Sequence, residues 1–141
     1  MEKKVLILWL LTILFWGVSP VIEKIGLRSV EPLLALFIRT SAALIAISLT
    51  LFLGSSISLS SLNLKNVGIL SLSGILAGFL GMLTYFSLLK AKNASQIVPL
   101  TSTYPLVATL LAILFLKEEL NFYKILGTTF IVIGIYLLFK S

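Results

Sequence analysis

The chain has 141 residues, of which 59% are hydrophobic and 11% are charged, and its mean hydropathy is +1.15. A soluble domain usually carries about 25% charged residues, so this composition excludes a water-covered surface and predicts an integral membrane protein. The formal net charge is +6. The sequence contains no cysteine and no histidine, and their absence excludes a disulfide framework, a thiolate nucleophile and the usual zinc ligand sets.

Five apolar segments follow one another along the chain, each long enough to cross about 30 Å of hydrocarbon. The first follows Lys3 and Lys4 and lacks the cleavage site of a signal peptide, so we expect it to be retained, with Pro20 bending or ending it. Because backbone groups in lipid must be satisfied internally, we predict an all-α, multi-pass protein of the cell membrane, a five-transmembrane-helix bundle in one domain over residues 1–141. The expected helices cover about residues 5–22, 33–53, 67–89, 96–116 and 122–139.

The basic residues flank these segments in ones and twos, which favours anchoring in lipid headgroups over binding to nucleic acid. Five of them fall on each side of the membrane, so the positive-inside rule selects no orientation. Either the chain inserts both ways round, or a weak bias in the first helix or a partner decides its orientation. One side collects Lys3, Lys4, Lys65, Lys117 and Lys124, and the other collects Lys24, Arg28, Lys90, Lys92 and Lys140.

Small residues recur at spacings of three and four in the third segment. Gly74, Gly78 and Gly81 share a helical face with Tyr85. Such a face lets another backbone come close or leaves room for a ligand, and helix packing is the more common use.

The fifth segment shows a similar spacing. Gly127 and Gly134 lie two turns apart on one face, and packing is again the expected use.

The fourth segment contains Pro99 and Pro105 among several hydroxyl residues, including Thr101 and Tyr104. A proline inside a helix removes one backbone hydrogen bond and frees the carbonyl four residues earlier. At membrane depth such carbonyls are tolerated where protein or a water-filled cavity meets them. The segment is therefore either a kinked structural helix or part of a polar pathway.

One charge lies inside a span. Arg39 is placed roughly 9 Å into the second segment at 1.5 Å per residue, and Glu23 stands at the end of the first segment on the same side. A Glu23–Arg39 pair would let both charges face the interior of the bundle. Intramembrane charges of this kind mark either a substrate contact or an anchoring pair near the interface.

Catalytic signatures are missing from the sequence. It contains no Gly-x-Ser-x-Gly, no His-Glu-x-x-His, no phosphate-binding loop and no aspartate. We therefore expect no enzymatic activity, no metal and no cofactor.

Several short motifs are spread over the whole chain. They are Leu14-Phe15-Trp16-Gly17, Lys24, Glu31-Pro32, Phe37-Ile38-Arg39, Pro105, Leu116-Lys117-Glu118-Glu119-Leu120, Gly127 and Gly134. Together they resemble the EamA-like family of the drug/metabolite transporter superfamily. The recurring glutamate of that family falls most naturally on Glu118, and Glu23 departs from the apolar or small residue that the family usually shows.

The resemblance implies a transporter in which two five-helix units of opposite orientation enclose a central cavity, and this sequence holds one unit of such an inverted-repeat fold. It predicts an oligomer, an antiparallel homodimer, that moves a small solute by alternating access. Alternatives are a lipid-linked-sugar flippase and a non-transporting membrane subunit of a larger complex. The residues expected to contact the substrate are Trp16, Glu23, Arg39, Tyr85, Thr101 and Tyr104.

Overall fold

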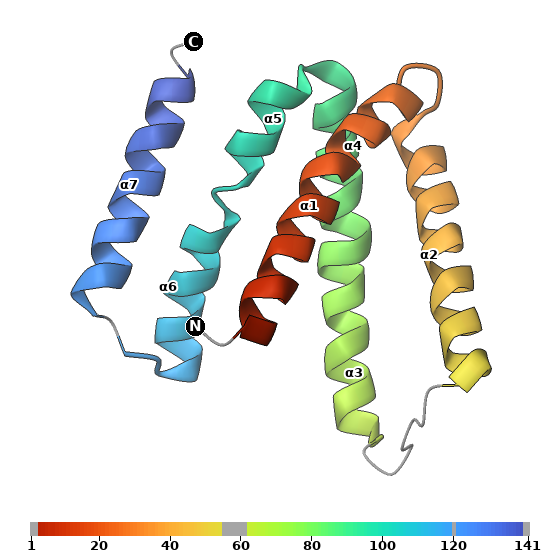
Figure 1. Cartoon of the computed structure of the whole chain (residues 1–141), viewed down its shortest axis with the longest axis horizontal. Coiled ribbons are helices and arrows are strands. Elements are labelled where there is room, and N and C mark those ends of the chain that lie inside the picture. Colours follow the sequence, from red (N-terminus) through yellow and green to blue (C-terminus); the bar gives the residue numbers. More distant parts are fainter. Residues whose placement is uncertain (1–2, 55–61, 120, 140–141) are drawn as a thin grey trace. The chain divides into compact units, whose positions relative to one another are not determined.

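The computed structural model describes residues 3–54, 62–119 and 121–139, and these are helical except for short connections. The chain divides into two compact units, the first ending at Ala91 and the second beginning at Lys92. Figure 1 labels their helices. The first unit holds α1 (Lys3–Gly26), α2 (Pro32–Gly54), α3 (Leu64–Ser73), η2 (Gly74–Gly81) and α4 (Met82–Ala91), and the second holds α5 (Ala94–Thr101), α6 (Tyr104–Leu116) and α7 (Phe122–Phe139).

Four stretches of the described residues are long and apolar enough to cross a membrane, and α7 is a shorter apolar helix. The four are Lys3–Gly26, Pro32–Gly54, Leu64–Ala91 and Ala94–Leu116. Most of their large apolar side chains are exposed within the chain, as expected for helices that face lipid or other helices of an assembly. The predicted class, an all-α membrane protein with five membrane segments, is confirmed.

Local sequence signals explain where several helices begin. Pro32 occupies the first turn of α2, where its missing N–H removes no helical hydrogen bond. Asn63 caps α3, because its side chain accepts a hydrogen bond from the backbone N–H of Asn66 at 2.7 Å. Asn121 does the same for α7, accepting from the N–H of Lys124 at 2.8 Å. Pro20 does not end the first helix, which continues to Gly26.

The core of the first unit lies at one end, where α1 finishes, α2 starts and α4 finishes. Leu27, Leu36, Phe86 and Leu89 are buried there, and both α1 and α2 pack against α4. The long connection between α2 and α3 includes residues 55–61, which lie outside the described residues. The packed end of the unit therefore positions the residues that the short α1–α2 connection brings together.

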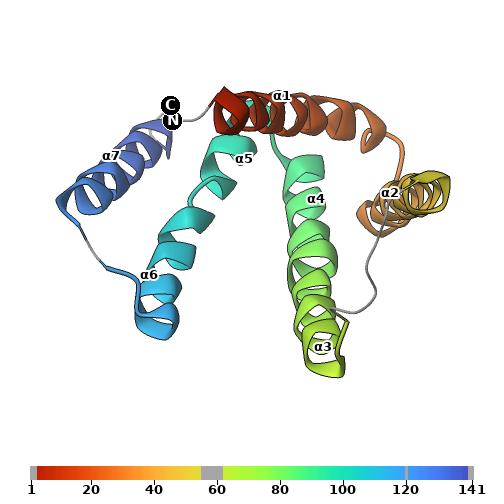
Figure 2. The same ribbon diagram turned by 60° about the horizontal axis from the view of Figure 1, so that its bottom comes forward.

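The third span contains a feature that the sequence analysis missed. Its central part, η2, is a π-helix of eight residues between two α-helical parts, and Figure 2 shows α3 and α4 as one continuous rod. π-Helical turns are rare and are often found at functional sites. A Cβ atom built on Gly81 would lie 3.2 Å from the carbonyl oxygen of Leu76, so the absence of a side chain there suits this backbone.

The fourth span, predicted as one segment over about 96–116 with two prolines inside it, consists of two helices. α5 ends at Thr101 and α6 begins at Tyr104, with a turn at Ser102 and Thr103 between them. Pro105 accounts for the break, since it has no N–H to donate to the carbonyl of Thr101. It becomes the N-terminal proline of a new helix. In this unit α5 packs against α7.

Candidate functional site

Glu23 and Arg39 form an ion pair in the first unit. The Nε atom of Arg39 lies 3.1 Å from Oε1 of Glu23, and this confirms the predicted pair. The short connection between α1 and α2 returns the chain antiparallel, which brings the end of α1 level with the second and third turns of α2. The Glu23 side chain is 12% exposed and that of Arg39 is 45% exposed, so the carboxylate is the more deeply covered partner.

Ser19 fixes the carboxylate from within α1. Its hydroxyl donates to the same Oε1 atom of Glu23 at 3.0 Å. The spacing of four residues, which places two side chains on the same helical face, was the signal in the sequence that could have identified Ser19. The carboxylate is therefore held by a hydroxyl on its own helix and by a guanidinium on the next.

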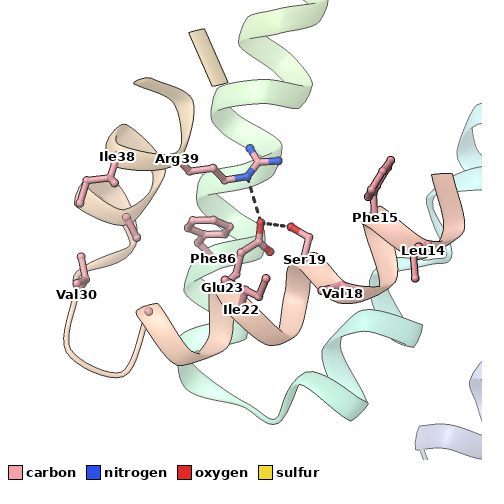
Figure 3. A pocket seen from close by; sticks show the side chains of 12 residues that line it. Leu14, Phe15, Val18, Ser19, Ile22, Glu23, Val30, Ile38, Arg39 and Phe86 are labelled. Atoms are coloured by element: carbon pink, nitrogen blue, oxygen red, sulfur yellow. Dashed lines mark hydrogen bonds and ion pairs between the residues drawn. The ribbon is translucent and has the colours of Figure 1, made fainter. Parts of the chain in front are cut away.

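This ion pair lies in the wall of an apolar groove of about 720 Å³. Figure 3 shows its lining side chains around the two charged groups. α1 supplies most of the wall, and α2, Phe86 of α4 and Val30 of the connection between α1 and α2 complete it. The lining residues are Leu14, Phe15, Val18, Ser19, Ile22, Glu23, Gly26, Val30, Ala35, Ile38, Arg39 and Phe86.

Two aromatic residues were also predicted to contact a substrate in this region. Tyr85 is half-buried on α4, and the charges of Glu23 and Arg39 both act on it electrostatically. Trp16 is 67% exposed. Neither side chain lines the groove, although Phe15 and Phe86, their neighbours in the sequence, do.

The remaining two predicted contacts belong to the second unit. The hydroxyl of Thr101 donates to the carbonyls of Ile97 and Val98 at 2.9 and 3.1 Å, so its proton is used within α5. Tyr104 is exposed at the start of α6. A substrate contact by either residue stays a prediction.

Glu118, the position on which the family resemblance placed its recurring glutamate, lies just after α6. Its Oε2 atom is 3.6 Å from Nζ of Lys124 on α7. The same Nζ donates to the backbone carbonyl of Glu119 at 3.0 Å. Glu118 and Lys124 line a small hollow of about 320 Å³. The pair ties the connection after α6 to the first turn of α7, which is a structural use of this glutamate.

Lys24 and Lys90 hold the packed end of the first unit together. Nζ of Lys24 donates to the backbone carbonyls of Leu89 and Lys90 at 2.6 and 3.3 Å. In return, Nζ of Lys90 donates to the carbonyl of Val30 and to Oε1 of Glu31 at 3.1 and 2.8 Å. We call these contacts the lysine clamp. The contacts from Lys24 satisfy carbonyls at the C-terminal end of α4 that have no helical donor, and those from Lys90 hold the connection between α1 and α2.

The glycine faces are open within the chain. A Cβ atom added at Gly74, Gly78, Gly127 or Gly134 would have no atom of the described residues within 4 Å, own helix backbone aside. Packing of these faces against another helix stays a prediction.

The sequence of the chain is similar to known proteins over nearly its whole length. The model of the EamA-like transporter family matches residues 3–140. An uncharacterized protein of Methanocaldococcus jannaschii is 34% identical over 133 residues, which are 94% of each chain. An uncharacterized transporter encoded in the cobO 3′ region of a Sinorhizobium species is 31% identical, with 92% of each chain covered.

A longer relative shows the same similarity over part of its length. The uncharacterized transporter YoaV of Bacillus subtilis is 29% identical over 127 residues, and the match covers 89% of this chain but 42% of that protein. The chain thus spans less than half of that relative. No solved structure matches the chain significantly.

Proposed function

The chain belongs to the EamA-like transporter family, and we propose that it moves a small solute across the membrane by alternating access. The proposal assigns it no catalytic step. Its active form is an oligomer, an antiparallel homodimer in which two copies of the five-helix unit face each other across the substrate pathway.

The Glu23–Arg39 ion pair is the observation that carries the proposal. Charged residues within membrane segments are costly and mark substrate or ion pathways when they face a cavity. Here a guanidinium and a carboxylate 3.1 Å apart line a groove whose other walls are apolar. A purely structural helix hairpin would pack with apolar side chains at these two positions at lower cost.

The relatives and the loop charges support the antiparallel pairing. Two relatives have nearly the same length as this chain, and another is more than twice as long. An odd number of spans puts the two ends of a unit on opposite sides, so two units fused in one chain are inverted relative to each other. Separate units reach the same arrangement if each inserts in both orientations. The equal number of basic residues on the two sides permits that.

The substrate pathway of the proposed dimer contains the groove beside Arg39 and Glu23, together with Tyr85. Trp16, Thr101 and Tyr104 reach the pathway from elsewhere in the assembly. Trp16 and Tyr104 are exposed within the chain, so both side chains are available for contacts in the proposed dimer. The glycine faces of the third and fifth spans supply close contacts between helices of the dimer.

Flux in liposomes that contain only this protein tests the transport function. A carrier gives saturable uptake of a radiolabelled solute mixture that is lost with Arg39→Gln, whereas a subunit that serves a larger complex gives none. Arg28→Gln is the matched control, since it removes an exposed basic residue in the connection between α1 and α2.

Two orientation variants test the dimer. Two lysines added beside Lys3 together with Arg28→Ser give seven basic residues against four, and serine at Lys3 and Lys4 with two lysines beside Lys140 gives three against seven. Both designs leave the lysine clamp intact. Lys140 lies outside the described residues. Each variant alone is expected to be inactive, and coexpression of the two is expected to restore uptake. Full activity of either variant alone would contradict the antiparallel dimer.

A further inference from the structure

Arg39 uses only one side of its guanidinium in the ion pair. Its Nε atom bonds to Glu23, and within the described part of the chain its two terminal nitrogens have no hydrogen-bond partner. Figure 3 shows these nitrogens turned away from the Glu23 carboxylate. A guanidinium offers five N–H donors in a fixed plane, and the terminal pair matches a carboxylate bidentately. The open end of Arg39 is therefore a preformed pair of hydrogen-bond donors for an anionic group.

The two charges of the pair are not equally accessible. The Arg39 side chain is 45% exposed and the Glu23 side chain is 12% exposed. A solute that enters the groove thus meets the guanidinium first and finds the carboxylate covered. This difference favours an anionic ligand over a cationic one.

The rest of the groove suits an apolar body. Its volume of about 720 Å³ falls within the range of about 300–1,000 Å³ that small-molecule sites occupy, and such sites combine apolar walls with few polar groups. Val18, Ile22, Ile38 and Phe86 supply apolar wall next to the ion pair. A ligand with one charged end and an apolar remainder would complement both parts.

We propose that this groove binds an amphipathic organic monoanion whose carboxylate is held by the terminal nitrogens of Arg39 and whose apolar part lies along α1 and α2. The inference rests on the proposed function, because it names the class of solute that the carrier would take. A monoanion is favoured over a dianion because Glu23 already offsets the charge of Arg39: a bound monoanion leaves one net negative charge in apolar surroundings, and a bound dianion leaves two.

Glu23 acts as a positioning residue in this site. Ser19 holds its carboxylate at 3.0 Å, and the carboxylate in turn holds Nε of Arg39 at 3.1 Å. The guanidinium is thereby fixed with its terminal edge toward the ligand. When the groove is empty, Glu23 also supplies the counter-charge that Arg39 needs in apolar surroundings.

A matched ligand series tests the proposal on the full chain in dodecyl maltoside micelles, whose headgroup carries no charge. Binding is measured by calorimetry for 3-phenylpropionate, 3-phenylpropanol, 3-phenylpropylamine and phenylalanine, which share an aromatic body and differ in charge. We expect 3-phenylpropionate to bind most tightly. Arg39→Gln should weaken it by about 10- to 100-fold, which is the effect of losing one or two charge-assisted hydrogen bonds.

Two further variants keep the test decisive if Arg39→Gln fails to fold. Arg39→Lys keeps the charge but loses the planar pair of donors, so it should weaken 3-phenylpropionate binding while leaving 3-phenylpropanol unaffected. Ser19→Ala should weaken the anion by a smaller factor through looser positioning, and Lys65→Gln should leave it unchanged.

The possible results separate this inference from the transport function. Equal or tighter binding of the amine, the alcohol or phenylalanine by the unmodified chain would overturn the anion site. Flux of another solute without any anion binding would keep the carrier and reject the site. Binding of 3-phenylpropionate that depends on Arg39, with no flux in liposomes, would keep the site and reject the carrier.

Discussion

Removing Arg39 should destabilise the first unit more than removing an exposed basic residue outside the ion pair, such as Lys65. The pair joins α1 to α2 at 3.1 Å, with the Glu23 side chain 12% exposed and the Arg39 side chain 45% exposed. Exposed ion pairs contribute about 0.2–1 kcal/mol, whereas breaking a buried pair costs about 3–5 kcal/mol. The partial exposure places Arg39→Gln between these limits, at about 1–3 kcal/mol of unfolding free energy.

The exposed fractions of the two side chains also predict which of the two single variants, Arg39→Gln or Glu23→Gln, loses more stability. Arg39→Gln leaves the covered Glu23 carboxylate without its counter-charge, whereas Glu23→Gln leaves a guanidinium that can reach toward the headgroup region. The arginine variant should therefore lose more stability than the glutamate variant. The double variant should recover part of the combined loss, because the two single changes remove one shared interaction.

Unfolding by titration with sodium dodecyl sulfate, followed by tryptophan fluorescence, measures all three variants in the same micelles. Lys65→Gln is the control: Lys65 is exposed at the start of α3 and makes no ion pair among the described residues, so its variant should stay within about 0.5 kcal/mol of the parent chain. Equal losses for Arg39→Gln and Lys65→Gln, or strictly additive effects in the double variant, would refute the coupling.

Three other perturbations give distinct expectations. Gly78→Leu should abolish the dimer in crosslinking while leaving the monomer folded, because Gly78 is open within the chain, and Phe79→Leu should keep the dimer; an intact dimer with leucine would place this face in lipid. Gly81→Ala should lower stability by about 1 kcal/mol relative to Gly78→Ala, since its Cβ would lie 3.2 Å from a backbone carbonyl of the π-helix, and equal melting temperatures would contradict this. Lys24→Gln should lower stability by about 1–3 kcal/mol through the lost clamp to the end of α4, and hydrogen exchange there that matches Lys65→Gln would argue against the clamp.

The membrane segments were predictable because a continuous apolar run of sufficient length has few alternatives to a membrane helix. The Glu23–Arg39 pair was predictable for a related reason. A short connection between two antiparallel spans brings residues of similar depth to the same end, and opposite charges there have strong reason to pair.

Other features depend on geometry that a sequence pattern does not carry. The lysine clamp joins Lys24 to carbonyls 65 and 66 positions later, and only the packing of α1 against α4 brings them together. The π-helix of η2 differs from an α-helix by one residue in its hydrogen-bond spacing, and the apolar, glycine-containing sequence fits both. The break at Ser102 and Thr103 was predictable in part. Pro105 indicates that one helical hydrogen bond is lost, but the sequence does not decide between a kinked helix and two helices.

The residues predicted to contact the substrate also fall into two groups. Glu23 and Arg39 meet because α1 and α2 belong to one packed unit, and Tyr85 lies on α4, which packs against both helices. Trp16 and Tyr104 are exposed, and neither lines the groove beside the ion pair. Their substrate contacts remain predictions of the dimer.

Accessibility of a tag at the C-terminus, measured from both sides of the membrane together with uptake, tests the central claim most directly. The unmodified chain carries a single-cysteine tag, which is labelled with a membrane-impermeant maleimide in intact cells and again after permeabilisation. The antiparallel dimer predicts labelling of about half the molecules from outside and the remainder only after permeabilisation, with active uptake. Labelling from one side only, in a chain that still transports its solute alone, would contradict the claim and require a parallel oligomer or another partner.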